Sequence, residues 1–202
     1  MNFKKNNMKS YKCDDGEESD SEIETEFNIK TKGNEIYYYE DIEKEKILEL
    51  INQIKDLTYD LQIKSIQYDF EPHIKLHIYS DGGDAFMGLS IYEFIKKNKV
   101  PIYTYINGYI ASAATFMFLA GKKRYMSKNS SVLIHQVSTS FWGKFEDLKD
   151  ECQNTTNLMD IVRNLYNENT IIKKKELKKL LQRELFLTFE DCRRIGFFTE
   201  EI

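Results

Sequence analysis

The most informative segment of the sequence is Gly108-Tyr109-Ile110-Ala111-Ser112-Ala113-Ala114. An alternating pattern typical of a strand precedes it over residues 100–107, and an apolar run typical of a buried helix follows over residues 115–120. The order predicts a strand, a tight turn and a helix, with Ser112 at or near the first helical turn. A hydroxyl there lies beside unpaired backbone N–H groups and the positive end of the helix dipole. Ser112 is therefore either a helix cap or a nucleophile whose reaction develops an oxyanion.

Length and composition narrow the class of protein. The chain has 202 residues, 41% of them hydrophobic, which suffices for one packed core. The net charge is −4 and the part expected to fold has no long basic run, so we expect no nucleic-acid partner. The apolar runs are far shorter than the ~20 residues of a spanning helix, so we expect no membrane partner. Three cysteines without paired spacing, and the lack of an apolar signal segment, favour a reducing, cytoplasmic location.

The first 34 residues differ in composition from the rest. They begin with several lysines, and eight acidic residues then fall between Asp14 and Glu26 with almost nothing apolar. Such a segment cannot bury enough apolar surface to offset the entropy lost on ordering. We therefore predict a disordered acidic tail over residues 1–34 and one folded domain over residues 35–202.

Strand and helix patterns alternate through the predicted domain, which indicates an α/β fold. The clearest strand has apolar residues alternating with polar ones over residues 74–78. A long helical stripe runs from about residue 145 to residue 166 and is of the kind that forms an oligomer seam. His73 and His77 share one face of the first strand but lie about 13 Å apart, too far to share an ion, so we expect no metal site.

Three further motifs carry chemically useful groups. Gly82 and Gly83 end the strand at residue 80 and allow the backbone to turn sharply and approach a ligand. His135 ends an apolar strand pattern, where a histidine has either a structural or a catalytic role. Glu184 comes shortly before the segment Phe186-Leu187-Thr188, which opens a short helix with a capping box.

Together and in this order, the motifs resemble those of the ClpP peptidase family. The resemblance covers roughly residues 36–202, and its strongest matches are residues 80–83, 108–113, 134–136 and 186–196. It implies a crotonase-type spiral of ββα units with a protruding helical handle over about residues 140–183. It also implies rings stacked around a chamber and a serine peptidase core that needs neither ATP nor another cofactor.

The resemblance also assigns roles by position. It makes Ser112 the nucleophile and His135 the general base, with the N–H groups of Gly82 and Ala113 as the oxyanion hole. The third triad position, an aspartate in the family, falls on Glu184. A glutamate can orient the imidazole, although it is one methylene longer. Three other carboxylates are weaker candidates for this role: Glu190, Asp191 and Asp160.

One departure from the family concerns its partner, a ring-shaped AAA+ ATPase unfoldase. The family accepts a hydrophobic loop of that partner in an apolar cleft between subunits. A polar cleft would lose much of the burial energy, at about 25 cal/mol per Å², so we expect docking to a typical Clp ATPase to be impaired. The matching positions here are Lys75, His77, Asn107 and Ser127, with Tyr105 and Tyr125 still aromatic.

The sequence thus predicts a ClpP-like serine endopeptidase that hydrolyses unfolded polypeptides or peptides. By the resemblance it self-associates into rings, heptameric and stacked through the handle. Two alternatives stay open. A non-catalytic ClpR-like ring subunit is favoured by Glu184 and the polar cleft. A crotonase-type acyl-CoA enzyme would use a comparable oxyanion hole without a serine–histidine pair.

Overall fold

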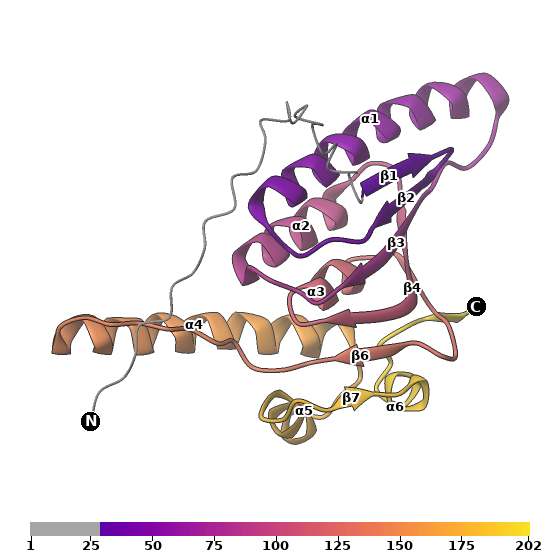
Figure 1. Cartoon of the computed structure of the whole chain (residues 1–202). Helices are drawn as coiled ribbons and strands as arrows, with labels where there is room; N and C mark the ends of the chain where they lie inside the picture. The colour runs from indigo at the N-terminus through magenta and orange to yellow at the C-terminus, as the bar shows by residue number, and fades with distance from the viewer. Residues whose placement is uncertain (1–28) are drawn as a thin grey trace, which may run out of the picture.

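Parallel strand pairing at the centre of the sheet places Ser112 at the carboxyl end of a strand. The computed structural model describes residues 29–202. The strands are β1 Ile29–Lys32, β2 Glu35–Tyr38, β3 Ile74–Ser80, β4 Ile102–Ala111, β5 Lys123–Met126, β6 Ser131–Leu133, β7 Phe186–Leu187 and β8 Glu200–Glu201. The helices are α1 Lys44–Tyr68, α2 Ala85–Lys97, α3 Ala114–Leu119, α4 Phe145–Asn169, α5 Lys174–Leu181 and α6 Phe189–Arg194 (Figure 1).

The sheet runs in the order β1-β2-β3-β4-β5-β8, and only the β1–β2 pair on this path is antiparallel. β4 is long enough to pair twice. Its first half pairs with β5, and its last three residues pair with β6, which in turn pairs with β7. The residue after β4 is therefore brought beside the end of β6.

Helices α1, α2 and α3 cover one face of this sheet (Figure 1). The predicted alternation in β3 is confirmed, because Ile74, Leu76 and Ile78 are buried against those helices. α1 packs through a stripe at helical spacing that includes Ile47, Leu50 and Ile54. It continues to Tyr68, beyond its last buried residue, Leu61.

Part of the predicted tail is a strand. β1 lies within the segment assigned to the acidic tail, so the boundary at residue 34 is wrong for residues 29–32. The strand forms because Ile29 is buried and because its backbone pairs with β2 around a turn at Gly33, whose φ is +63°. The remainder of the predicted tail lies outside the described residues.

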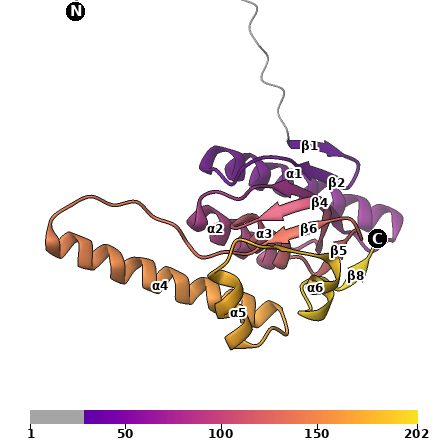
Figure 2. The same cartoon turned by 60° about the horizontal axis from the view of Figure 1, so that its bottom comes forward.

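Helix α4 lies within the segment predicted as the handle, residues 140–183. Its first half carries no buried side chain, and burial begins only at Leu158. Figure 2 shows this helix and the segment before it extending away from the sheet. Phe145 and Leu148, the start of the predicted stripe, are 70% and 40% exposed, so this half of the helix has an uncovered apolar side. Within residues 29–202, no helix combines the length and the apolar character needed to cross a bilayer.

Candidate active site

Ser112 adopts a backbone conformation that is unusual for a serine. It directly follows β4 and has a φ of +51°, in the left-handed region that costs about 1–3 kcal/mol for a residue with a side chain. Two contacts hold it there: its N–H donates to Leu133 O at 2.9 Å, and its carbonyl accepts from Thr115 N at 3.0 Å. The N-cap of α3 is Ala113, and no side chain caps that helix, so the capping interpretation of Ser112 is wrong.

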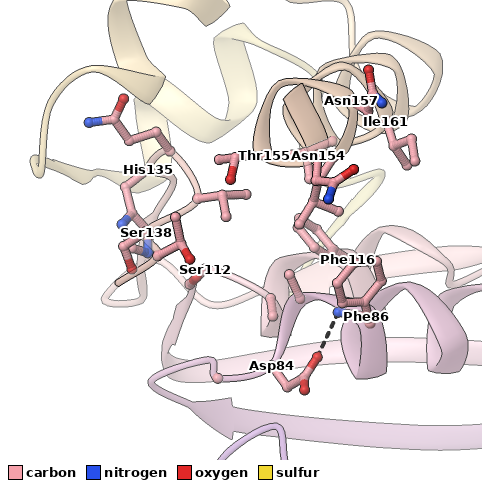
Figure 3. Close-up of a pocket in the computed structure, with 18 of the residues that line it drawn as sticks. Asp84, Phe86, Ser112, Phe116, His135, Ser138, Asn154, Thr155, Asn157 and Ile161 are labelled. Carbon is pink, nitrogen blue, oxygen red and sulfur yellow. Dashed lines mark hydrogen bonds between the residues drawn. The ribbon is translucent and has the colours of Figure 1, made fainter. Parts of the chain in front are cut away.

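A cavity of about 560 Å³ opens beside Ser112 (Figure 3). It lies between the start of α2, the segment that follows β6 and the inner half of α4. Its walls mix apolar and polar side chains, so it can accept part of a polypeptide without being purely hydrophobic. The apolar lining includes Phe86, Phe116, Leu158 and Val162, and the polar lining includes Ser138, Asn154, Thr155 and Asn157.

His135 lies two residues beyond β6 and lines the same cavity as Ser112. Backbone contacts on either side fix the segment that carries it. Gln136 N donates to Leu181 O at 2.8 Å, and Val137 N lies 3.1 Å from Met159 Sδ. The segment is therefore tied to both α5 and α4, although it has no regular secondary structure.

Ser112 and His135 thus meet at one cavity, on the same side of it (Figure 3). No hydrogen bond joins their side chains within residues 29–202. His135 Nδ1 lies 3.9 Å from Glu184 Oε1, which leaves Nε2 as the nitrogen available to a hydroxyl. Catalytic hydrogen bonds are often long in ligand-free structures and tighten in the substrate complex.

Glu184 is the carboxylate that the structure brings to His135, but it is mostly solvent-exposed, at 80% against 23% for the histidine side chain. At 3.9 Å the two atoms are too far apart for a hydrogen bond, and they form an ion pair only when the imidazole is protonated. The three weaker candidates are engaged elsewhere. Glu190 and Asp160 pair with arginines three residues on, and Asp191 caps α6 through Thr188.

The glycine turn at Gly82 lies against the turn at Ser112. Gly82 has a φ of +100°, and a Cβ there would be only 2.6 Å from Ser112 Cβ. Its N–H, however, donates to Ser80 Oγ at 3.1 Å, so one predicted oxyanion donor already has a partner. Ala113 N–H, the other, has no partner in the part of the chain that the structure describes. Gly83, rather than Gly82, lines the cavity, and no sequence signal distinguishes the two glycines.

The cavity wall that α4 supplies is a second feature that the sequence did not indicate. Asn154, Thr155 and Asn157 line the cavity from this helix, together with Tyr166 further along it. The stripe in the sequence marked the apolar side of the helix and gave no sign that neighbouring polar residues would face a site. Within residues 29–202, no three His, Cys, Asp or Glu side chains gather in a way that could hold a metal ion.

Three of the predicted cleft residues, His77, Tyr105 and Tyr125, lie on the sheet face opposite the helices. Together with Tyr37 they form an aromatic ladder. Consecutive rings stack at centroid distances of 4.6, 4.7 and 4.5 Å. Asn107 Nδ2 lies 3.0 Å from His77 Nδ1, so the amide donates to that nitrogen and the imidazole proton resides on Nε2. The polar side chains of Asn107 and His77 therefore hydrogen-bond to each other, and this bond holds His77 in the stack of rings.

His77 makes the stability of the folded chain depend on pH. Burial lowers its pKa, the Glu35 carboxylate opposes that shift and Lys75 adds to it. Its Nε2 is buried without a hydrogen-bond partner within residues 29–202 and lies 4.0 Å from Glu35 Oε2. A lowered pKa means that the unfolded chain takes up a proton near pH 6.5, whereas the folded chain resists protonation until the pH is lower.

We therefore expect the free energy of unfolding to hold its full value above about pH 7 and to fall as the pH drops below about 6.5. His77→Phe keeps an aromatic ring in the ladder but cannot titrate, so it should flatten this dependence. Urea unfolding at pH 8 and pH 5.5 measures the difference for both proteins. Equal losses of stability in the wild type and the variant would contradict the assignment to His77.

The fold and the site define a class: a mixed α/β protein with a serine and a histidine on one cavity, beside a glycine turn at the carboxyl ends of parallel strands. Comparison with known families identifies the family within this class. The model of the Clp protease family matches residues 30–202. The chain therefore belongs to the Clp protease family, of which it is a divergent member, as the motifs indicated.

The relatives show how far it diverges. The ATP-dependent Clp protease proteolytic subunit of Deinococcus radiodurans is 28% identical over 134 residues, which are 65% of this chain and 66% of that protein. ClpP1 of Listeria monocytogenes has a similar structure, with a TM-score of 0.69 at 21% identity, covering 84% of this chain and 91% of the other. A point mutant of that protein gives a TM-score of 0.72 at 22% identity, with the same coverage. These structures confirm the predicted ClpP fold.

Proposed function

We propose that this chain is a ClpP-like serine endopeptidase that hydrolyses peptide bonds of unfolded polypeptides or peptides. The observation that carries the proposal is the turn at Ser112. A serine with positive φ follows a central strand and faces one cavity with His135. It precedes Ala113, whose N–H has no partner among residues 29–202. Strained residues of this kind concentrate at active sites, because the surrounding structure must hold them in place.

In the proposed reaction, His135 Nε2 removes the proton of Ser112 Oγ as the oxygen attacks the scissile carbonyl. The imidazolium then returns that proton to the leaving amine. Water hydrolyses the acyl-enzyme by the same steps. Ala113 N–H stabilises the oxyanion, a contribution of about 3–4 kcal/mol for a well-placed donor. Gly82 N–H is a second donor to the oxyanion, and it shares its proton between Ser80 Oγ and the oxyanion.

The assembly belongs to the proposal as well. Proteins of the ClpP family form rings, and we propose the same for this chain, with seven subunits to a ring and the uncovered half of α4 joining two rings. Burial of Phe145 and Leu148 between rings would remove exposed apolar surface from water. The aromatic ladder replaces the family's apolar cleft, so we propose that a typical Clp ATPase loop binds it weakly.

Labelling with a fluorophosphonate tests the assignment without knowledge of the substrate. The assembled protein, whose mass is measured by native mass spectrometry, is treated with the probe, and the adduct is located by peptide mapping. We expect a single adduct on Ser112, together with hydrolysis of fluorogenic peptides. A known serine peptidase labelled in parallel controls for the probe.

One alternative has a specific observation in its favour. The missing Ser112–His135 hydrogen bond and the occupied Gly82 N–H also suit a non-catalytic, ClpR-like ring subunit. If the assembled protein remains unlabelled while the reference peptidase reacts, the non-catalytic role replaces the peptidase.

Glu184→Gln tests the third position of the triad. An exposed carboxylate 3.9 Å from the imidazole is screened by water, and exposed ion pairs contribute at most about 1 kcal/mol. We expect kcat for a fluorogenic peptide to fall about fivefold, with KM unchanged. Glu190→Gln, at another exposed carboxylate that pairs with Arg193, is the matched control and should retain full activity. A thousandfold loss of kcat would show that Glu184 moves into a buried hydrogen bond with His135. Full activity would show that Glu184 has no role in the reaction.

A further inference from the structure

A chain of two buried hydroxyls connects the handle helix to the nucleophile turn. Tyr166, on α4, is 1% exposed, and its hydroxyl lies 2.6 Å from Thr115 Oγ1 on α3. Thr115 is fully buried, and its Oγ1 donates to the carbonyl of Ser112 at 2.5 Å. The ring of Tyr166 also packs edge-on against Phe116, with centroids 5.9 Å apart, which fixes where its hydroxyl points.

The direction of the protons in this chain follows from elementary chemistry. A carbonyl oxygen can only accept, so the single proton of Thr115 Oγ1 points to Ser112 O. The hydroxyl of Tyr166 must then be the donor to Thr115 Oγ1. Burial strongly raises the pKa of Tyr166, so this donor keeps its proton throughout the usable pH range. The order is Tyr166 to Thr115 to the carbonyl of Ser112.

That carbonyl belongs to the same peptide group as the N–H of Ala113. Because the peptide group is planar, holding its oxygen in place also fixes the direction of the N–H on the opposite side. Ser112 O accepts from both Thr115 N and Thr115 Oγ1, so two donors hold it. Hydrogen bonds in a chain also polarise one another, which makes the N–H of the same amide a better donor.

We propose that Thr115 and Tyr166 are positioning residues, which orient and polarise the Ser112–Ala113 peptide group so that Ala113 N–H points to the oxyanion. This inference rests on the proposed peptidase function. It gives the handle helix a role inside the site, because a residue of α4 holds the peptide group on which the oxyanion hole depends.

Four variants separate this role from a general effect on folding. Thr115→Val keeps the side-chain shape and removes the bond to Ser112 O. Tyr166→Phe keeps the ring and removes the terminal donor. Thr115→Ser restores the hydroxyl. The matched control is Thr104→Val, which removes another buried hydroxyl bond to α3, from Thr104 Oγ1 to Phe118 O at 2.8 Å, far from Ser112 in the helix.

The readout is the second-order rate of fluorophosphonate labelling as a function of pH, since the phosphoryl oxygen occupies the oxyanion hole during this reaction. Losing a whole oxyanion donor costs about 10²–10³-fold, so misorienting one should cost about tenfold in Thr115→Val and less in Tyr166→Phe. Thr115→Ser and Thr104→Val should label at close to the wild-type rate. The midpoint of the pH profile should stay in place, because His135 is untouched.

Thr115→Val labelling at the wild-type rate would overturn the inference while leaving the peptidase intact. So would an equal loss in Thr104→Val, or a shifted midpoint. Absence of labelling in the wild type, with a reference peptidase reacting, would instead overturn the peptidase and this inference with it. Thermal unfolding of every variant verifies that each rate belongs to folded protein.

Discussion

Replacing Ser112 with alanine is expected to lower the rate of peptide hydrolysis by about 10⁵–10⁶-fold, and His135→Ala should cost about as much. The two losses should be similar because the serine and the histidine act as one unit, in which neither group works without the other. Both side chains face the cavity, and Ser112 Oγ makes no hydrogen bond within residues 29–202, so its removal leaves no buried group unpaired.

Fluorogenic peptide hydrolysis measures these losses, and light scattering checks that the assembly survives. Ser90→Ala, at an exposed serine of α2 outside the cavity, is the control for the substitution itself and should keep full activity. If the double variant of Ser112 and His135 were far slower than either single variant, the two groups would act independently and the proposed mechanism would fail.

Gly82→Ala is expected to have the second largest effect, on activity and on stability together. An added Cβ would lie 2.6 Å from Ser112 Cβ and 2.8 Å from Ala111 O, so the turn at Ser112 itself would have to move. The φ of +100° is strained for alanine in any case. We expect labelling of Ser112 to slow by at least about a hundredfold and the free energy of unfolding to fall by about 2–3 kcal/mol.

The chain offers a matched control at Gly33, whose φ of +63° also disfavours alanine but whose Cβ would meet nothing within 4 Å. Gly33→Ala should lose only about 1 kcal/mol of stability, with labelling at the wild-type rate. Urea unfolding and labelling rates measure both variants. A fully active Gly82→Ala protein would show that the glycine turn does not constrain the nucleophile.

Several elements were predictable because their signals are local. The alternation over residues 74–78 placed β3 and its buried face, and Thr188 with Asp191 predicted the capping box that opens α6. Gly196, with a φ of +66°, follows the end of that helix. The serine, the histidine and the glycine turn were found from ordered motifs, and the structure places Ser112 and His135 on one cavity.

Other features depended on contacts between distant parts of the chain. β1 escaped prediction because three of its four residues are exposed and its stability comes from pairing with β2. The contact of His135 with Glu184, 49 positions later, and the exposure of that carboxylate follow from three-dimensional positions that no motif specifies. Tyr166 appeared in the sequence only as part of a helical pattern.

The sequence by itself determined the α/β class, because hydrophobic periodicity and turn residues act over a few neighbouring positions. The resemblance of its ordered motifs to the ClpP family indicated the family and the pair of residues proposed to react. Only the tertiary structure decided the left-handed turn at Ser112, whose N–H bonds to Leu133 O, and the link from Tyr166 to that turn. The physical reason is that these depend on directed hydrogen bonds in a packed interior. The bond between Tyr166 and Thr115 joins residues 51 positions apart, and its geometry exists only once α4 has packed against α3.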